Sequence, residues 1–344
     1  MPLPNETAPL TVTPGAIRFN TDSMKLEYYR GGPVGFGTTT QTGEWVNLTT
    51  DSPDIQTGGA RGLFMGGQPG SGPGVNTIDY ITISTTGNAI SFGSLTGSVK
   101  HTSSCSSSTR GIRGGGFGNQ NTIDYIAVSS TGNAIVFGSL TPSTYSAGGC
   151  SSSTRGLFGG GYIINVIQYI TMASTGNAVD FGDLTQARAY GSSCSSSTRG
   201  IFAGGYIPTI ISQNTIDFVT ISTLGNAADF GDLTTARSGL ASCSNAVRGL
   251  FGAGAPNQNT IDFVTISTLG NASDFGDLTS ARGYTNAACS SATRGVFGGG
   301  YAPSVTNTID YVTIMSVGNA IDFGDLTGVK GGPTACSNGH GGLG

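Results

Sequence analysis

Six cysteines recur through the chain at nearly equal intervals, so the first question is whether their thiols do chemistry. They are Cys105, Cys150, Cys194, Cys243, Cys289 and Cys336. Six thiols could form three disulfides or a metal cluster, but the closest two along the chain, Cys150 and Cys194, are 44 positions apart. Each cysteine also stands in its own repeat. We therefore expect small buried thiols that pack, with redox or metal roles as the alternative, and no cofactor.

Arginine and aspartate form two further series. The arginines each precede a glycine and are Arg61, Arg110, Arg155, Arg199, Arg248 and Arg294. The aspartates each end an Asn-Thr-Ile-Asp segment and are Asp79, Asp124, Asp217, Asp262 and Asp310. These aspartates share a strand face with apolar residues such as Ile81, so we expect them to be buried, where an unpaired charge is costly. We predict structural ion pairs between the two series. Gln168 replaces the aspartate in the third repeat, which argues against a catalytic carboxylate.

A second aspartate series lies in the motif Asp-Phe-Gly-Asp of the last four repeats. Its pairs are Asp180/Asp183, Asp229/Asp232, Asp274/Asp277 and Asp322/Asp325. Paired carboxylates could bind Ca²⁺, but the first two repeats read SFGS and VFGS, and the oxygen-rich neighbours that Ca²⁺ requires are not evident. We expect turn and strand-edge roles for this series.

Catalysis has little support in the sequence. Histidine is the usual general base, and His101 and His340, the only two histidines, both lie outside the repeated pattern. Catalytic sites are asymmetric, whereas the repeats are nearly identical to one another. We expect no enzymatic activity.

The elements that must position these residues are six repeats, whose Arg-Gly pairs are spaced 49, 45, 44, 49 and 46 residues apart. Within a repeat, short apolar runs are bounded by Gly, Ser, Thr and Asn, and no helical period is sustained. Four strands are predicted in each, as in "GSSCSSST", "RGIFAGG", "NTIDFVTIST" and "NAADFGDLT". Four short strands in a repeat of this length are typical of a β-propeller blade.

The two ends of the array complement each other. The first repeat lacks a convincing cysteine-bearing strand, whereas the last repeat is followed by such a strand, "TACSNG", without a further second strand in the sequence. We predict an all-β, six-bladed propeller over residues 56–344, in which the C-terminal strand near Cys336 pairs with the strand near Leu63 and removes both free sheet edges. The strand that ends in Gly-Gly and the "DFGDLTTARSG" turn resemble kelch repeats over roughly residues 58–344, with Phe181, Phe230, Phe275 and Phe323 where kelch blades carry Trp.

Composition excludes several partners. The 344 residues include 58 glycines and are only 10% charged, with a net charge of −4, so neither nucleic acid nor an anionic membrane is an expected partner. No apolar run is long enough for a membrane helix, and the first residues lack the pattern of a secretion signal.

Residues 1–55 are a different kind of sequence, with short predicted strands that form a small β-rich anchor. About 40 residues with one hairpin bury too little surface to be stable alone, so this segment should attach to a partner or form a homo-oligomer. The residues expected to do so are Ile17, Phe19, Leu26, Tyr28, Tyr29 and Trp45. The segment "GAIRFNTDSMKLEYY…WVNL" resembles tail-fibre and other virion proteins of tailed bacteriophages, and the repeats resemble structural proteins of marine cyanophages.

The resemblance implies a virion structural protein, made in the host cytoplasm, that contacts other tail or capsid proteins and displays a propeller for host-surface adhesion or for decoration of the particle. Variable loops that contain Tyr162, Tyr206 and Tyr301 are the candidate contact sites, with a host glycan as a possible ligand. The alternatives are a glycan-binding lectin or kelch-like scaffold without a particle and, third, a carbohydrate-active enzyme.

Overall fold

The computed structural model describes residues 16–20, 25–31, 43–47, 60–118, 120–162, 164–207, 209, 211–284, 287–301 and 303–343. The chain divides into two compact units, Met1–Gln56 and Thr57–Gly344. In the first unit, β1 (Ile17–Asn20), β2 (Lys25–Gly31) and β3 (Gly43–Asn47) form an antiparallel sheet with β2 in the middle.

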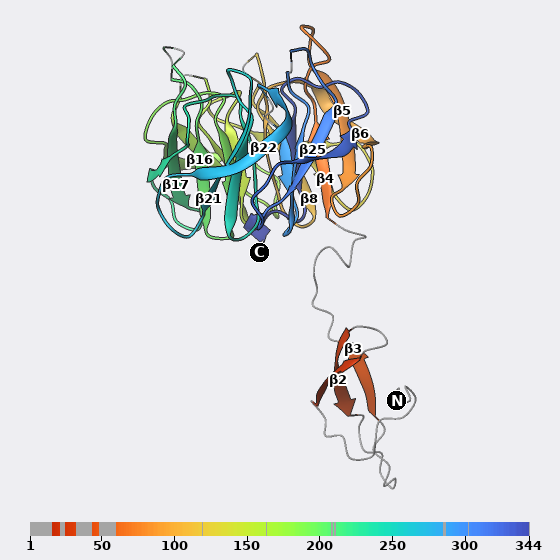
Figure 1. Cartoon of the computed structure of the whole chain (residues 1–344). Coiled ribbons are helices and arrows are strands. Elements are labelled where there is room, and N and C mark those ends of the chain that lie inside the picture. The colour runs from red at the N-terminus through yellow and green to blue at the C-terminus, as the bar shows by residue number, and fades with distance from the viewer. Residues whose placement is uncertain are drawn as a thin grey trace. The chain divides into compact units, whose positions relative to one another are not determined.

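The second unit is a six-bladed β-propeller, which confirms the predicted fold class (Figure 1). Each blade is a four-stranded antiparallel sheet. The innermost strands, from blade 1 to blade 6, are β27 (Thr334–Ser337), β7 (Ser103–Ser106), β11 (Gly148–Ser151), β15 (Ser192–Ser195), β19 (Ala241–Ser244) and β23 (Ala288–Ser290). The second strands are β4 (Arg61–Met65), β8 (Arg110–Gly114), β12 (Arg155–Gly159), β16 (Arg199–Ala203), β20 (Arg248–Gly252) and β24 (Arg294–Gly298).

The two outer strands of each blade follow in chain order. The third strands are β5 (Val75–Thr82), β9 (Thr122–Ala127), β13 (Val166–Thr171), β17 (Thr215–Thr220), β21 (Gln258–Thr265) and β25 (Thr308–Thr313). The outermost strands are β6 (Ile90–Val99), β10 (Ile135–Ser139), β14 (Val179–Asp183), β18 (Ala228–Asp232), β22 (Ser273–Arg282) and β26 (Ile321–Asp325).

The core lies between blades rather than within them. In one cluster, Ile201 and Phe230 of blade 4 pack with Phe251 and Val264 of blade 5, all almost fully buried. A four-stranded sheet has two faces, so a blade leaves apolar surface exposed unless a neighbour covers each face. This explains why the same apolar pattern is repeated in every blade.

The Gly-Asn-Ala tripeptide of each repeat ties its blade to the outermost strand of the preceding one. In blade 5, the Gly270 and Ala272 amides donate to the carbonyls of Phe230 and Asp232, and the Asn271 side chain accepts from the Asp232 amide at 3.0 Å. Gly231, at φ 148°, has no room for a Cβ because the Gly270 carbonyl lies against it. The paired motifs Phe-Gly and Gly-Asn-Ala are therefore the two halves of one inter-blade contact.

The ring closes as the sequence predicted. Strand β27 is antiparallel to β4 and places Cys336 opposite Leu63, so blade 1 takes its innermost strand from the C-terminal end of the chain.

Serine hydroxyls join the six innermost strands around the axis. The Ser151 hydroxyl donates to the Ser106 carbonyl at 2.7 Å, and equivalent bonds link each blade to the one before it. The remaining donors are Ser106, Ser195, Ser244, Ser290 and Ser337, at 2.6 to 2.8 Å. Six bonds thus form a closed circle, and loss of one strand would break it.

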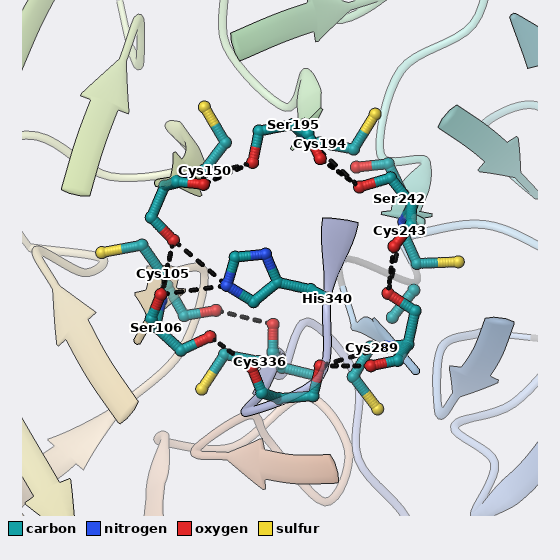
Figure 2. A pocket seen from close by; sticks show the side chains of 18 of the residues that line it. Cys105, Ser106, Cys150, Cys194, Ser195, Ser242, Cys243, Cys289, Cys336 and His340 are labelled. Atoms are coloured by element: carbon teal, nitrogen blue, oxygen red, sulfur yellow. Dashed lines mark hydrogen bonds between the residues drawn. The ribbon is translucent and has the colours of Figure 1, made fainter. Parts of the chain in front are cut away.

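The C-terminal tail enters the axis, where Figure 2 shows His340 inside this circle, and η1 (Gly341–Leu343) ends the described chain. His340 donates from Nε2 to the Ser106 carbonyl at 2.9 Å and accepts at Nδ1 from the Gly342 amide at 3.0 Å. A Cβ at Gly342 would overlap the Ser151 carbonyl oxygen. The two cavities left along the axis have volumes of about 50 and 30 Å³, enough for a few waters.

We predict that deleting residues 333–344 abolishes the cooperative unfolding of the propeller. The deletion removes the partner of β4, the Ser337 member of the hydroxyl circle and the axial tail, a loss comparable with the roughly 5–15 kcal/mol that stabilises a typical domain. Thermal unfolding followed by circular dichroism measures the effect. Deletion of residues 1–56 is the control and should leave the propeller transition in place. A truncated chain that melts like the full chain would contradict the closure.

Candidate functional site

The buried aspartates do form ion pairs, but the predicted partners were wrong. Asp217 pairs with Arg188 and Asp262 with Arg237, each at 2.9 Å, Asp79 pairs with Lys330 at 3.1 Å, and Asp310 pairs with Arg282. Each cation lies four residues after the leucine of Asp-Leu-Thr, in the segment that leaves the preceding blade. The threonine of the same tripeptide also donates to the aspartate, as Thr234 does to Asp262 at 2.7 Å. One short segment therefore supplies both the cation and the hydroxyl.

The inter-blade contacts before blades 2 and 3 depart from this pattern, but they too leave no buried carboxylate unpaired. Before blade 2 the cation position holds Val99, and Asp124 pairs instead with Arg113, which replaces the phenylalanine found at that place in the other blades. Before blade 3 the cation position holds Thr144, and the aspartate is replaced by Gln168, whose Oε1 accepts from the Thr141 amide at 2.6 Å. Every buried carboxylate of the series is thus matched, as the cost of an unpaired buried charge requires.

The arginines of the Arg-Gly series serve a different contact. The Arg199 guanidinium lies over the Phe218 ring of its own blade, 5.0 Å from the centroid, and donates to the Ile266 carbonyl of the next blade at 3.1 Å. Arg61, Arg110, Arg155, Arg248 and Arg294 repeat both contacts. The series joins blades, but through a carbonyl rather than a carboxylate.

The six cysteines are free, buried and packed between blades. Their sulfur atoms point away from the axis and from His340 (Figure 2). The Cys105 Sγ lies so close to Gly156 of the next blade that a Cβ there would come within 2.5 Å of it, and the other five cysteines face the equivalent glycines. Burial raises the pKa of Cys194 and of Cys336 to about 12, so these thiols stay protonated. The glycine of each Arg-Gly pair makes room for this sulfur.

The Asp-Phe-Gly-Asp series follows the outer strands. Asp229 and Asp180 are exposed, and the Asp183 and Asp232 amides donate to the Asn226 and Asn271 side chains of the next blade. Within the described residues, no group of three or more His, Cys, Asp or Glu side chains could hold a metal ion.

In the N-terminal sheet, the predicted attachment residues differ in exposure. Tyr29 is buried and contacts Trp45, with the ring centroids 5.4 Å apart, and Arg18 lies over the Trp45 ring. Ile17 is 63% exposed and Tyr28 is half-buried. The backbones of Phe19 and Leu26 pair across β1 and β2, but their side chains lie outside the described structure.

Aromatic side chains gather at the other end of the axis from the C-terminal tail. The loop tyrosines that the sequence singled out each pair with a ring from the segment entering the same blade. Tyr162 stacks on Tyr145 at 5.1 Å and Tyr206 stacks on Tyr190 at 5.3 Å, with interplanar angles of 17° and 23°. Tyr301 meets Tyr284 edge-on at 6.2 Å. With His101 and Phe117, these six tyrosines form what we call the aromatic face.

The aromatic face is continuous across blades. Tyr190 contacts both His101 at 5.3 Å and Tyr284 at 5.7 Å, and Phe117 bridges His101 and Tyr145. Phe117 and Tyr162 are 51% and 46% exposed, so part of this cluster faces solvent. The rings therefore offer a contact surface around the axis instead of completing the core.

The backbone beneath these rings is strained. The residue six positions after the leucine has a φ of 52° to 63° in every blade; it is His101, Ser146, Tyr190, Gly239, Tyr284 and Gly332. Five backbone hydrogen bonds link consecutive members, such as Tyr190 to Ser146 at 2.9 Å. Glycine adopts this conformation freely, whereas a bulky residue there costs about 1–3 kcal/mol and tends to mark a functional site. Blades 5 and 1 have the expected glycine, while three blades carry an aromatic ring despite the cost.

A small polar network borders the rings. Gln68 donates to the Tyr301 hydroxyl at 2.5 Å and accepts from Lys100 at 2.6 Å, and the Lys100 ammonium also lies 5.0 Å from the Phe117 centroid. Within the described residues, Lys100 forms no ion pair with a carboxylate. His101 is 9% exposed, and its Nδ1 has no hydrogen-bond partner among the described residues. Burial, and secondarily Lys100, lowers the His101 pKa to about 4, so the ring is neutral at pH 7.

Three of the eight residues of the aromatic face were predicted from the sequence as contact residues. Tyr162, Tyr206 and Tyr301 follow the Gly run of each repeat and are easily noticed, but Tyr145, Tyr190 and Tyr284 were missed. Aligning the repeats on their leucine would have exposed Tyr190 and Tyr284, because the sixth position after it holds Gly in two repeats, Ser in one, and His or Tyr in three.

No protein-family model matches this chain, and no curated protein matches it either. Among the described residues, none of the helical structure is long and apolar enough to cross a membrane.

We predict strong coupling between Arg237 and Asp262. Arg237→Thr should cost roughly 3–5 kcal/mol because it leaves a buried carboxylate unpaired. The double variant Arg237→Thr/Asp262→Gln reproduces the Thr144 and Gln168 pair that the chain uses before blade 3, so it should cost less than the single variant. Urea unfolding of the two single variants and the double variant measures the coupling. Strictly additive effects would contradict the charge-matching account.

We also predict that His101 makes the propeller less stable as the pH falls from 6.5 towards 4. Above pH 6.5 the ring is neutral in both states; below it, the unfolded chain binds a proton that the folded protein, with its pKa of about 4, does not. The full effect is about 3 kcal/mol. His101→Asn, which tolerates the same backbone conformation, should remove this part of the pH dependence in denaturant unfolding. His340, whose pKa burial also lowers, is unchanged between the two proteins and cancels in the comparison.

Proposed function

We propose that this chain is a non-enzymatic display protein that uses the aromatic face of its propeller to recognise a surface. The observation that carries the proposal is the convergence of six tyrosines, Phe117 and His101 at one end of the axis. The repeated cysteines, arginines, aspartates, serines and Gly-Asn-Ala tripeptides hold the blades together. The side chains of the aromatic face have no such role in the scaffold. A rigid ring that carries variable side chains on one face is a common arrangement for recognition.

We further propose that the N-terminal unit is the attachment module and that the particle is a virion of a tailed bacteriophage. The sequence resemblance of residues 15–48 to tail-fibre segments supports the proposal that the particle is a phage virion. The division of the chain into two compact units supports a separate attachment module. The small size of the sheet supports the expectation that it binds other virion proteins or further copies of itself.

Cryo-electron microscopy of purified particles tests this proposal. We expect a six-bladed disc on the particle, with β1, β2 and β3 packed against a tail or capsid protein or against copies of the same sheet. The matched comparison is light scattering of the full chain and of residues 57–344, in which only the full chain should form oligomers. Particles that lack the protein would contradict the virion role. A lectin without a particle would then be the better interpretation, because stacked tyrosines suit a sugar ligand in either setting.

A further inference from the structure

The aromatic face differs from blade to blade although the scaffold beneath it is nearly sixfold. The first residue after the Gly run is aromatic in blades 2, 3, 4 and 6, whereas blade 5 has Ala255 and blade 1 has Gln68. Blade 5 also has Gly239 at the strained position, and the Tyr284 ring lies against that glycine. Blade 5 thus contributes no ring of its own, and the contact between Tyr190 and Tyr284, with centroids 5.7 Å apart, spans it.

The chemistry of this region restricts its ligand. Tyrosine offers a flat, electron-rich face together with a hydroxyl that both donates and accepts hydrogen bonds. Burial and neighbouring tyrosines raise the pKa of Tyr206 to about 12, and burial also raises the pKa of Tyr190, so both hydroxyls stay protonated. Among the residues that the structure describes, Lys100 is the one cation that lies over a ring of the aromatic face. One cation is too few for a nucleic acid backbone, which is bound through many phosphate contacts.

We propose that the aromatic face binds an oligosaccharide at blade 5, with sugar rings stacked on Tyr190, Tyr206 and Tyr284. A pyranose ring has an apolar face of C–H groups, which carry partial positive charge and fit the negative face of an aromatic ring, and a rim of hydroxyls that tyrosine hydroxyls can bind. Tyr284 is 38% exposed, so at least one ring of this site faces solvent. This inference rests on the recognition role proposed above.

The strained positions allow a substitution that removes a ring without changing the scaffold. Tyr190→Gly introduces the residue that the chain itself has at Gly239 and Gly332, with the same backbone conformation. Ala255→Tyr does the opposite and restores the aromatic residue that four other blades carry. Leu269→Ala is the matched control, because Leu269 is 58% exposed in the turn between β21 and β22, at the other end of blade 5.

The experiment is binding of the full chain to a printed array of defined neutral and acidic oligosaccharides, followed by titration calorimetry with the strongest hit. We expect binding by the unmodified protein and by Leu269→Ala, and at least a tenfold loss in both Tyr190→Gly and Ala255→Tyr, with thermal unfolding confirming that all variants fold. An array without hits would overturn the proposal. So would binding that Tyr190→Gly leaves unchanged, or binding of acidic glycans alone that only Lys100→Met abolishes.

The outcome is separable from that of the display proposal. A chain found on particles that binds no oligosaccharide would retain the display role and lose the sugar ligand. If the protein is absent from particles but Tyr190→Gly abolishes its oligosaccharide binding, the ligand proposal stands and the virion proposal is wrong.

Discussion

Crowding at the propeller axis is the constraint on which the rest of this structure depends. Six innermost strands meet there, and each can contribute only small side chains, so the strands consist of Gly, Ala, Ser, Thr and Cys. Because these residues bury little apolar surface, the strands are joined by the circle of serine hydroxyl bonds instead. The cysteine sulfurs point outward and fill the space above the next blade's glycine. The C-terminal tail fits the axis for the same reason, since Gly341 and Gly342 leave no side chain to accommodate.

Farther from the axis, buried ion pairs hold neighbouring blades together. A carboxylate buried between blades must be matched locally, and the chain does this with a cation from the preceding blade or with Arg113 from the adjacent strand. Before blade 3 it replaces the carboxylate by the neutral Gln168. The compensation shows that each joint is an independent electrostatic unit. Because three different combinations of side chains occupy equivalent inter-blade positions, the pairing is structural.

Function, by contrast, depends on where the symmetry is broken. The repeated series are used to hold blades together, while the loops at one end of the axis vary in length and side chain. Three of the aromatic residues there, His101, Tyr190 and Tyr284, occupy strained backbone positions where glycine would fit better, and this strain does not stabilise the scaffold. A rigid platform that presents a few asymmetric rings is suited to recognition, and the low overall charge suits a neutral or weakly charged ligand.

The sequence alone determined the fold, because the repeat period, the strand pattern and the complementary chain ends are local or periodic signals. It predicted that the strand near Cys336 pairs with the strand near Leu63, that the aspartates are buried and that the cysteines are packed as free thiols. It did not identify the partner of Asp262, because Arg237 and Arg248 are chemically equivalent candidates until the strands are placed, and Arg237 reaches the carboxylate from the preceding blade. It named three tyrosines of the aromatic face but missed Tyr145, Tyr190 and Tyr284, because these are separated along the chain and only closure of the ring brings them to one end of the axis.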